Sequence, residues 1–289
     1  MSVVGIDRIV SPGIRTVIAI ASRLAPLTLG RWAGRRFVTP TRRRPLPSLF
    51  DAQADIIVLP APKAVTAYAW GSGPAVLLAH GWEGDHQDLN AFVAPLVDAG
   101  YRVVALDWPG HGRSAGSGPA PVTAMARAMQ ALQRKVGPFR AAIAHSLGGI
   151  ALALAMGEGL AVGRAAFIAT PAHPIDVKTR VARALGLGAR AEAAMTAEIS
   201  RLAGLPIEWV GFANLARHFR LPSLLVHASD DRMVPISDMR ALVDAMPDAA
   251  VHVGTGLGHK RILSDPTVVA RVVDFVRLGE RPALADRAA

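Results

Sequence analysis

Three short segments in the second half of the chain carry side chains that together can perform nucleophilic catalysis. Ser146 stands in "AHSLGG", a pair of acids follows in "DDRMVP", and His259 stands in "GLGHK". A serine hydroxyl is a weak nucleophile unless a base takes its proton and an acceptor holds that base. The order along the chain therefore predicts Ser146 as nucleophile and His259 as general base, with Asp230 or Asp231 orienting the imidazole.

The surroundings of Ser146 indicate a sharp turn between a strand and a helix. Residues 140–145 form an apolar run that predicts a strand, and residues 147–156 predict the start of a helix. Ala144 and Gly148, two positions before and after the serine, leave room for a strained turn. This is the pattern of a G-x-S-x-G nucleophile elbow, with Ala in place of the first Gly.

Two backbone amides are expected near the same point. A turn of this kind directs the Leu147 N–H, at the positive end of the new helix, toward an incoming carbonyl oxygen. Trp82, in "LLAHGWEG", follows another apolar strand and places its N–H at the same sheet edge. We expect these two amides to form an oxyanion hole.

Elements that could position these residues alternate regularly from residue 55 onward. Short apolar runs separated by helical segments predict an α/β protein with a mostly parallel sheet of about eight strands and helices on both faces. The expected strands cover 55–60, 65–70, 74–80, 102–107, 140–145, 164–170, 223–229 and 250–253, and the expected helices lie near 87–99, 122–135, 147–156, 236–246 and 266–277. Residues 171–222 also have a helical pattern, which predicts a helical cap over one end of the sheet.

These segments resemble the α/β-hydrolase superfamily over roughly residues 55–280. The similar segments are "AHGWEG", "VVALDWPGHGRS", "AHSLGG", "DDRMVP" and "GLGH", in the superfamily's order. The "HGW" start, the single insertion and the "GLGHKRIL" end are similar to its bacterial serine esterase and lysophospholipase-like branch. The resemblance implies an α/β-hydrolase domain over 51–289 with a cap at about 171–222, leaving residues 1–50 as an N-terminal extension. It also selects Asp231 over Asp230, and implies a site made of Ser146, Asp231, His259 and the amides of Trp82 and Leu147.

Other side chains near these motifs are expected to support the site. His145 should pack on the opposite side of the strand end, pointing away from Ser146, and His80 should hold its loop by hydrogen bonds. Asp107 begins a loop that shapes the site from below. Trp209 and Phe212 in the insertion suggest an apolar acyl pocket.

Composition restricts the classes of function. The chain has 289 residues, 51% of them hydrophobic, and no cysteine, so thiolate catalysis and cysteine-based metal sites are excluded. The net charge of +10 is concentrated in residues 1–50, which contain nine arginines and one acid, Asp7. Nucleic-acid motifs and metal-ligand spacings are missing from the sequence, and its two glycine-rich stretches do not fit nucleotide loops. We therefore expect no nucleic-acid partner, no metal and no cofactor.

The N-terminal segment has the pattern of an amphipathic helix. Residues 9–30 are mainly apolar, but Arg15 and Arg23 interrupt them too often for a bilayer-spanning helix. The helix either lies on the body of its own protein or contacts anionic lipid at a membrane surface through residues 9–44. Residues 39–49 are expected to form an extended, proline-stiffened connector. The expected location is cytoplasmic, with peripheral contact at the inner membrane under the second alternative.

The motifs favour a serine hydrolase that cleaves carboxylic esters, as a carboxylesterase does. A lysophospholipase, lipase or thioesterase acting at the membrane surface is an alternative within the same chemistry. A binding protein that keeps the fold without turnover is the alternative outside it. In each case the expected partner is a small ester or a lipid-like molecule, and the sequence predicts no particular oligomeric state.

Overall fold

A single sheet of eight strands forms the centre of the protein. The structure, a computed structural model, describes residues 11–43, 45–46, 48–60 and 64–278. The strands, in sheet order, are β1 (Asp55–Leu59), β2 (Val65–Trp70), β4 (Arg102–Leu106), β3 (Ala75–Ala79), β5 (Ala141–His145), β6 (Ala165–Ile168), β7 (Ser223–Ala228) and β8 (Ala250–Gly254). The β1–β2 and β2–β4 pairs are antiparallel and the others are parallel, so the mostly parallel sheet expected from the apolar runs is confirmed.

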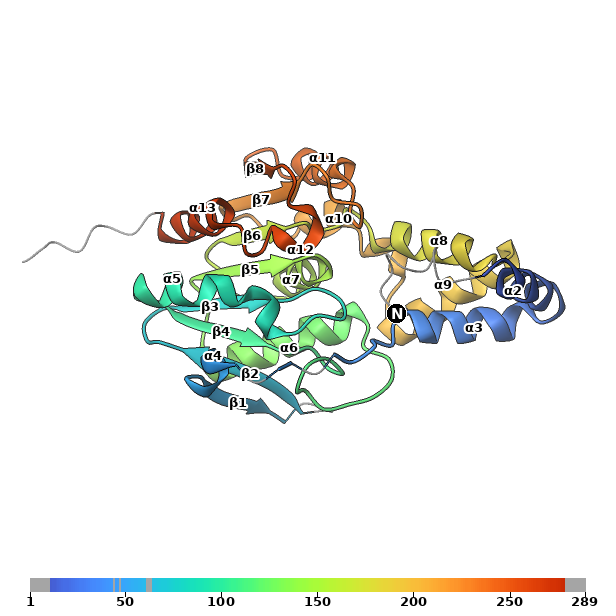
Figure 1. Cartoon of the computed structure of the whole chain (residues 1–289), viewed down its shortest axis with the longest axis horizontal. Coiled ribbons are helices and arrows are strands. Elements are labelled where there is room, and N and C mark those ends of the chain that lie inside the picture. Colours follow the sequence, from blue (N-terminus) through green and yellow to red (C-terminus); the bar gives the residue numbers. More distant parts are fainter. Residues whose placement is uncertain (1–10, 44, 47, 61–63, 279–289) are drawn as a thin grey trace, which may run out of the picture.

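Helices cover both faces of this sheet (Figure 1). One face packs against η2 (His86–Phe92), α5 (Val93–Asp98) and α13 (Pro266–Arg277). The other packs against α6 (Val122–Val136), α7 (Leu147–Gly157), α10 (Phe212–Ala216) and α11 (Ile236–Ala245). Helix α12 (Gly258–Arg261) is a short turn after β8. Every residue of α7 from 148 to 156 is buried, so this helix lies inside the core and holds the chain rigidly behind Ser146.

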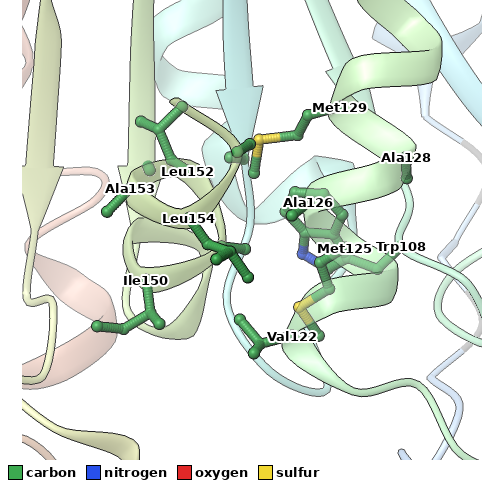
Figure 2. Packing of buried hydrophobic residues seen from close by; sticks show 14 of the residues in the cluster. Trp108, Val122, Met125, Ala126, Ala128, Met129, Ile150, Leu152, Ala153 and Leu154 are labelled. Atoms are coloured by element: carbon green, nitrogen blue, oxygen red, sulfur yellow. The ribbon is translucent and has the colours of Figure 1, made fainter. Parts of the chain in front are cut away.

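Side chains from α6 and α7 fill the space between these two helices. Figure 2 shows Val122, Met125 and Met129 of α6 opposite Leu154 of α7, with Trp108 beside them. All five are less than a tenth exposed. Close packing of this kind holds α7 in one position against α6, because core side chains occupy single positions at near-crystalline density.

The insertion between β6 and β7 is helical, as the sequence predicts. It contains α8 (Pro174–Leu185), α9 (Ala189–Ala203), η3 (Ile207–Trp209) and α10. Helices α8 and α9 project beyond the sheet, whereas α10 returns to the sheet and packs on α7 and α11 (Figure 1). Only the first part of the insertion therefore has the position expected of a cap.

The N-terminal segment forms two helices, where the sequence pattern predicted one. They are α2 (Pro12–Leu24) and α3 (Pro26–Phe37), and the first two residues of the predicted segment lie outside the described residues. The break falls at Ala25, with φ −139° and ψ 59°, because Pro26 has no N–H to continue α2 and disfavours a helical residue before it.

Both N-terminal helices pack on the insertion. Helix α3 lies along α9, and α2 contacts α8 and α9 (Figure 1). The packing of α3 depends on Gly30 and Gly34, whose Cα atoms face α9 so closely that a methyl group on Gly34 would lie 2.7 Å from the Met195 carbonyl oxygen. The segment therefore lies on the body of its own protein, although the division of the chain at residue 50 stays a prediction.

The connector after α3 is extended and tied to the body. Arg42 donates to the carbonyl oxygens of Ser114 and Gly116, and Arg43 forms ion pairs with Asp85 and Asp88. Helix α4 (Leu49–Ala52) follows, with its first turn capped by Ser48. Among residues 11–278 as far as they are described, no helix has both the length and the apolar character required to cross a bilayer.

Candidate active site

Ser146 occupies a strained turn between β5 and α7. Its backbone has φ 53° and ψ −127°, a region that non-glycine residues rarely adopt. The strain is maintained because α7 crosses close to β3: a methyl group on Gly148 would lie 2.7 Å from the Ala79 carbonyl oxygen. The turn therefore has the geometry of the elbow that the spacing of small residues predicts.

The structure brings Ser146, His259 and Asp231 into one hydrogen-bonded chain. The Ser146 hydroxyl lies 3.1 Å from Nε2 of His259, and Nδ1 of the same ring lies 2.7 Å from Oδ2 of Asp231. An ionised carboxylate can only accept, so Nδ1–H donates to Asp231 and Nε2 is left to accept the serine proton. His259 and Asp231 are both buried, which shields their hydrogen bond from water.

The second oxygen of Asp231 is held by backbone amides. Oδ1 accepts from the N–H groups of Met233, at 2.7 Å, and Val234, at 3.0 Å. Burial opposes ionisation of this carboxyl, but the hydrogen bond and charge of His259, together with the two amides, hold the pKa of Asp231 below its ordinary value. The group is therefore a carboxylate at neutral pH, as an acceptor for the imidazole must be.

Asp230 has a different position from its neighbour. Its side chain is exposed and accepts the N–H of Gly258 at 3.1 Å, one residue before His259. This contact fixes the loop that carries His259, so Asp230 acts on the loop rather than on the ring.

Trp82 and Leu147 both lie beside Ser146. Leu147 is the first residue of α7, and a methyl group on Gly81 would lie 3.1 Å from Cβ of Ser146, which shows how closely the loop before Trp82 approaches the serine. Both residues line the same cavity as Ser146 and His259. Both residues therefore border the space in front of Ser146, and an oxyanion hole formed by their amides stays a prediction.

His80 supports this loop from behind. Its Nδ1–H donates to the Gly81 carbonyl oxygen at 2.7 Å, and its Nε2 accepts the Trp108 N–H at 3.2 Å. Complete burial lowers the pKa of His80 to about 3, so the ring stays neutral and keeps both bonds. The predicted role as a loop support agrees with this geometry.

His145 has a different environment from the one expected. Its ring does not point away from the site: Nε2 donates to the backbone oxygen of His259 at 3.0 Å, and the two ring centres are 4.7 Å apart. Burial lowers the pKa of His145 to about 3, so it too is neutral at physiological pH. The reason is that the loop after β8 folds over the end of β5, a contact between distant segments that the local pattern does not reveal.

Another buried histidine, His86, joins helix α4 to the end of β4. His86 lies between Asp107, 3.0 Å from Nδ1, and Asp51, 3.1 Å from Nε2, and stacks on Tyr68. Asp107 therefore holds His86 as well as the loop below the site, where it accepts the Arg113 N–H at 2.7 Å. Sequence reasoning missed this cluster, because its members are separated by up to 56 positions along the chain.

The charge of His86 has a defined effect on stability. Burial opposes the charge, but the hydrogen bonds and negative charges of Asp107 and Asp51 raise the pKa of His86 above its ordinary value. The charged ring therefore contributes to the free energy of unfolding. This contribution is complete below the ordinary pKa of about 6.5 and is lost as the pH rises through the folded-state pKa. The pKa values of the two carboxyls are lowered, so their contribution is lost instead as the pH falls through those values.

A cavity of about 580 Å³ opens beside Ser146. Its wall on the side of the insertion is mainly aliphatic, with Val177, Val181, Ala184, Ile199 and Ala203 from α8 and α9. The wall is completed by Phe37 and Val38 from the N-terminal segment, a contribution that the sequence did not predict. A space of this size and lining can hold an apolar chain.

The two aromatic residues expected in the pocket lie elsewhere. Trp209 is 71% exposed. Phe212 is buried against Phe167 of β6, and the centres of the two rings are 5.0 Å apart in an edge-to-face contact. Neither lines the cavity, so that expectation was wrong. Phe212 belongs to α10, which packs on the sheet rather than in the cap.

The fold and this site together define a class of protein. Residues 76–272, more than half of the chain, match the alpha/beta hydrolase family, so the chain belongs to that family. Among the residues with described positions, no group of three or more histidine or acidic side chains is arranged to hold a metal ion.

Similar proteins agree with this assignment. The chain is 26% identical over 235 residues to a 2-hydroxy-6-oxononadienedioate/2-hydroxy-6-oxononatrienedioate hydrolase from Pseudomonas sp, and the match covers 65% of this chain and 79% of that protein. A shorter stretch of 46 residues is 48% identical to a non-heme haloperoxidase from Rhodococcus erythropolis, covering 16% of this chain and 17% of that protein. The esterase Pf2001 of Pyrococcus furiosus has a similar fold, with a TM-score of 0.65 and 16% identity over 83% of this chain and 98% of that one. The family and its hydrolase relatives support a hydrolytic activity.

Proposed function

We propose that the protein is a serine hydrolase that cleaves carboxylic esters through an acyl-enzyme on Ser146. The observation that carries the proposal is the hydrogen-bonded chain from Ser146 through His259 to Asp231, set at the wall of an apolar cavity. Three side chains 85 and 28 positions apart (231 − 146 and 259 − 231) have no structural need to converge in this order.

The reaction follows from the positions of these groups. As Oγ of Ser146 attacks the ester carbon, its proton passes to Nε2 of His259, and the buried Asp231 stabilises the imidazolium that results. The negative charge moves to the carbonyl oxygen, where the Trp82 and Leu147 amides donate to it; the loss of one such donor costs about 100- to 1,000-fold in rate. The imidazolium then gives its proton to the departing alcohol, which leaves the acyl group on Ser146.

The second half of the cycle uses the same groups with water. His259 takes a proton from a water molecule, whose oxygen attacks the acyl carbon, and returns that proton to Oγ of Ser146 as the acid departs. The aliphatic wall from α8 and α9 supports an apolar acyl chain as the substrate's buried half.

A fluorophosphonate probe tests this chemistry, because it reacts only with a serine activated by a neighbouring base. The wild-type protein should be labelled at Ser146 and should hydrolyse p-nitrophenyl esters, and Ser146→Ala should lose both properties. Ser229→Ala is the matched control, since Ser229 also follows a strand at the carboxyl edge of the sheet but contacts Thr255. Folded wild-type protein that neither reacts with the probe nor turns over any ester would establish the non-catalytic binding protein instead.

Thioesterase and lysophospholipase activity differ from this proposal in the leaving group alone. The apolar cavity receives the acyl chain in each case, so substrates with one acyl chain and different leaving groups separate the alternatives. We expect higher kcat/KM for the p-nitrophenyl ester than for the matching thioester or lysophospholipid. The reverse order would move the protein to one of the other two activities while keeping the Ser146 mechanism.

A further inference from the structure

Helix α2 packs on the insertion with the side that contains Ser22, where Ile18, Ala19 and Ala21 are half-buried. Ser22 is buried, and its hydroxyl accepts the N–H of Gly188 at 2.7 Å. The side chain of Arg15 lies against Gly186, at the end of α8. A surface helix of a globular protein normally turns its apolar stripe toward the body. In α2, by contrast, the side that contacts α8 and α9 lies opposite the apolar stripe and contains Ser22 and Arg15.

The apolar side of α2 consequently faces outward. Its residues, together with one from the first turn of α3, form what we term the α2 apolar row: Ile14, Val17, Ile20, Leu24 and Leu27. Their exposure runs from 52% at Ile14 to 81% at Leu24, so each keeps most of its surface in contact with solvent. At about 100° per residue, the four residues on α2 span an arc of about 120°. A row of this width on one helix is larger than the scattered apolar residues usual on a protein surface.

The charges of the N-terminal segment itself have one sign. Residues 8–50 contain no aspartate or glutamate, and Arg15, Arg23 and Arg31 are exposed on α2 and α3. Arg23 lies about 60° from Ile20 around the helix, at the margin of the apolar arc. An apolar face bordered by arginines is the arrangement of helices that lie in the plane of a membrane interface, where aliphatic side chains enter the acyl region and guanidinium groups contact anionic headgroups.

We propose that the α2 apolar row and its flanking arginines dock the protein on an anionic membrane surface. Charge complementarity favours lipid over a second copy of the chain, because two copies joined through this face would bring their arginines together. Docking of α2 in the interfacial plane also places the α8–α9 pair, and with it the aliphatic wall of the cavity, near the lipid. This proposal concerns the location of the enzyme and is independent of its ester chemistry.

Vesicle flotation with the full-length protein tests the proposal directly. The protein should float with vesicles of phosphatidylcholine and phosphatidylglycerol at equal amounts, and bind vesicles of phosphatidylcholine alone at least about 10-fold more weakly. Raising the salt from about 50 mM to about 500 mM should weaken binding to the anionic vesicles, because screening acts on the arginine contacts. Equal binding to both vesicle types, or no binding to either, would overturn the proposal.

A triple variant of the row separates specific docking from general adhesion. Val17→Ser, Ile20→Ser and Leu24→Ser together should reduce partitioning to anionic vesicles on the order of 100-fold, because three exposed aliphatic side chains no longer enter the acyl region. The matched control is Ile56→Ser with Val58→Ser, which removes two exposed aliphatic side chains from the outer face of β1 and should leave partitioning within about 2-fold.

Two further measurements on the triple variant keep the outcome clear. Turnover of a soluble short-chain ester should equal that of wild type, since none of the three side chains lines the cavity. Light scattering should give the same mass for the wild-type protein and the triple variant. A triple variant that binds vesicles as well as wild type, or that changes from a dimer to a monomer, would overturn the proposal, and the second result would identify another copy of the chain as the occupant.

Discussion

Replacement of Gly30 by alanine should loosen the N-terminal helices and the cavity wall together. A methyl group at this position would lie 2.6 Å from Cβ of Ala194 and still closer to the carbonyl oxygen of Ala191, both on α9. The backbone cannot rotate out of the way as a side chain can, so α3 and α9 must separate by about 1 Å, and overpacking of this kind costs about 3 kcal/mol. Alanine regains about 1 kcal/mol through its higher helix propensity. The net loss of stability should be about 2 kcal/mol.

Thermal unfolding and limited proteolysis measure this effect. A loss of about 2 kcal/mol should lower Tm by about 5 °C in a chain of this size. Trypsin should also cut the arginine-rich α3 earlier, and KM for esters should rise more than kcat falls, because Phe37 at the end of α3 lines the cavity. Gly13→Ala is the control: nothing lies near its methyl group, so stability should be unchanged or higher. A Gly30→Ala variant as stable as wild type would refute the argument that these glycines set the α3–α9 distance.

Three further predictions test the site and its surroundings. Asp231→Asn should lower kcat by about 100- to 10,000-fold in a steady-state ester assay, and Asp230→Asn by less than about 10-fold, because only the first of these carboxylates contacts the imidazole; equal effects would contradict the assignment. Val181→Trp should shift the preferred p-nitrophenyl ester to a shorter acyl chain by filling the cavity beside α8, and an unchanged chain-length profile would place the acyl group elsewhere. His86→Gln should destabilise the protein more at pH 5.5 than at pH 8.5 in urea unfolding, because the stabilisation by the charged ring is complete below its ordinary pKa and declines as the pH rises toward the raised folded-state pKa; a difference that is the same at both pH values would contradict a raised pKa.

The sheet could be predicted from the sequence because its strands are buried on both faces. Runs such as 75–79 and 141–144 are apolar without interruption, and each is followed by a histidine and then by glycine or serine at the turn. Such runs identify a strand clearly, because apolar and polar residues alternate in a strand with one face in solvent, and this alternation is lost when both faces of the sheet are covered by helices. The position of Ser146 followed from the same signal, because the small residues on either side of it are required by the turn itself.

Contacts between distant segments were beyond the reach of local patterns. The bond from His145 to the backbone of His259 joins β5 to the loop after β8, and no periodicity in either segment reports it. Trp209 and Phe212 were assigned to the pocket because they lie in the insertion, yet α10 returns to the sheet and takes Phe212 with it. A pattern identifies the element to which a residue belongs, but tertiary packing decides which cavity that element lines.

The N-terminal helices illustrate the same limit in a form that bears on function. The sequence identified an amphipathic segment and offered two alternatives, packing on the protein or contact with lipid. The structure shows the packing, through Ser22 and its neighbours, and it leaves the side with Val17 and Leu24 exposed, which is the side on which the proposed lipid contact depends. A helix that used its apolar side for packing would have no means of binding a membrane. Packing through the side that contains Ser22 is therefore what leaves Val17 and Leu24 exposed, while Gly30 and Gly34 allow α3 to lie close against α9.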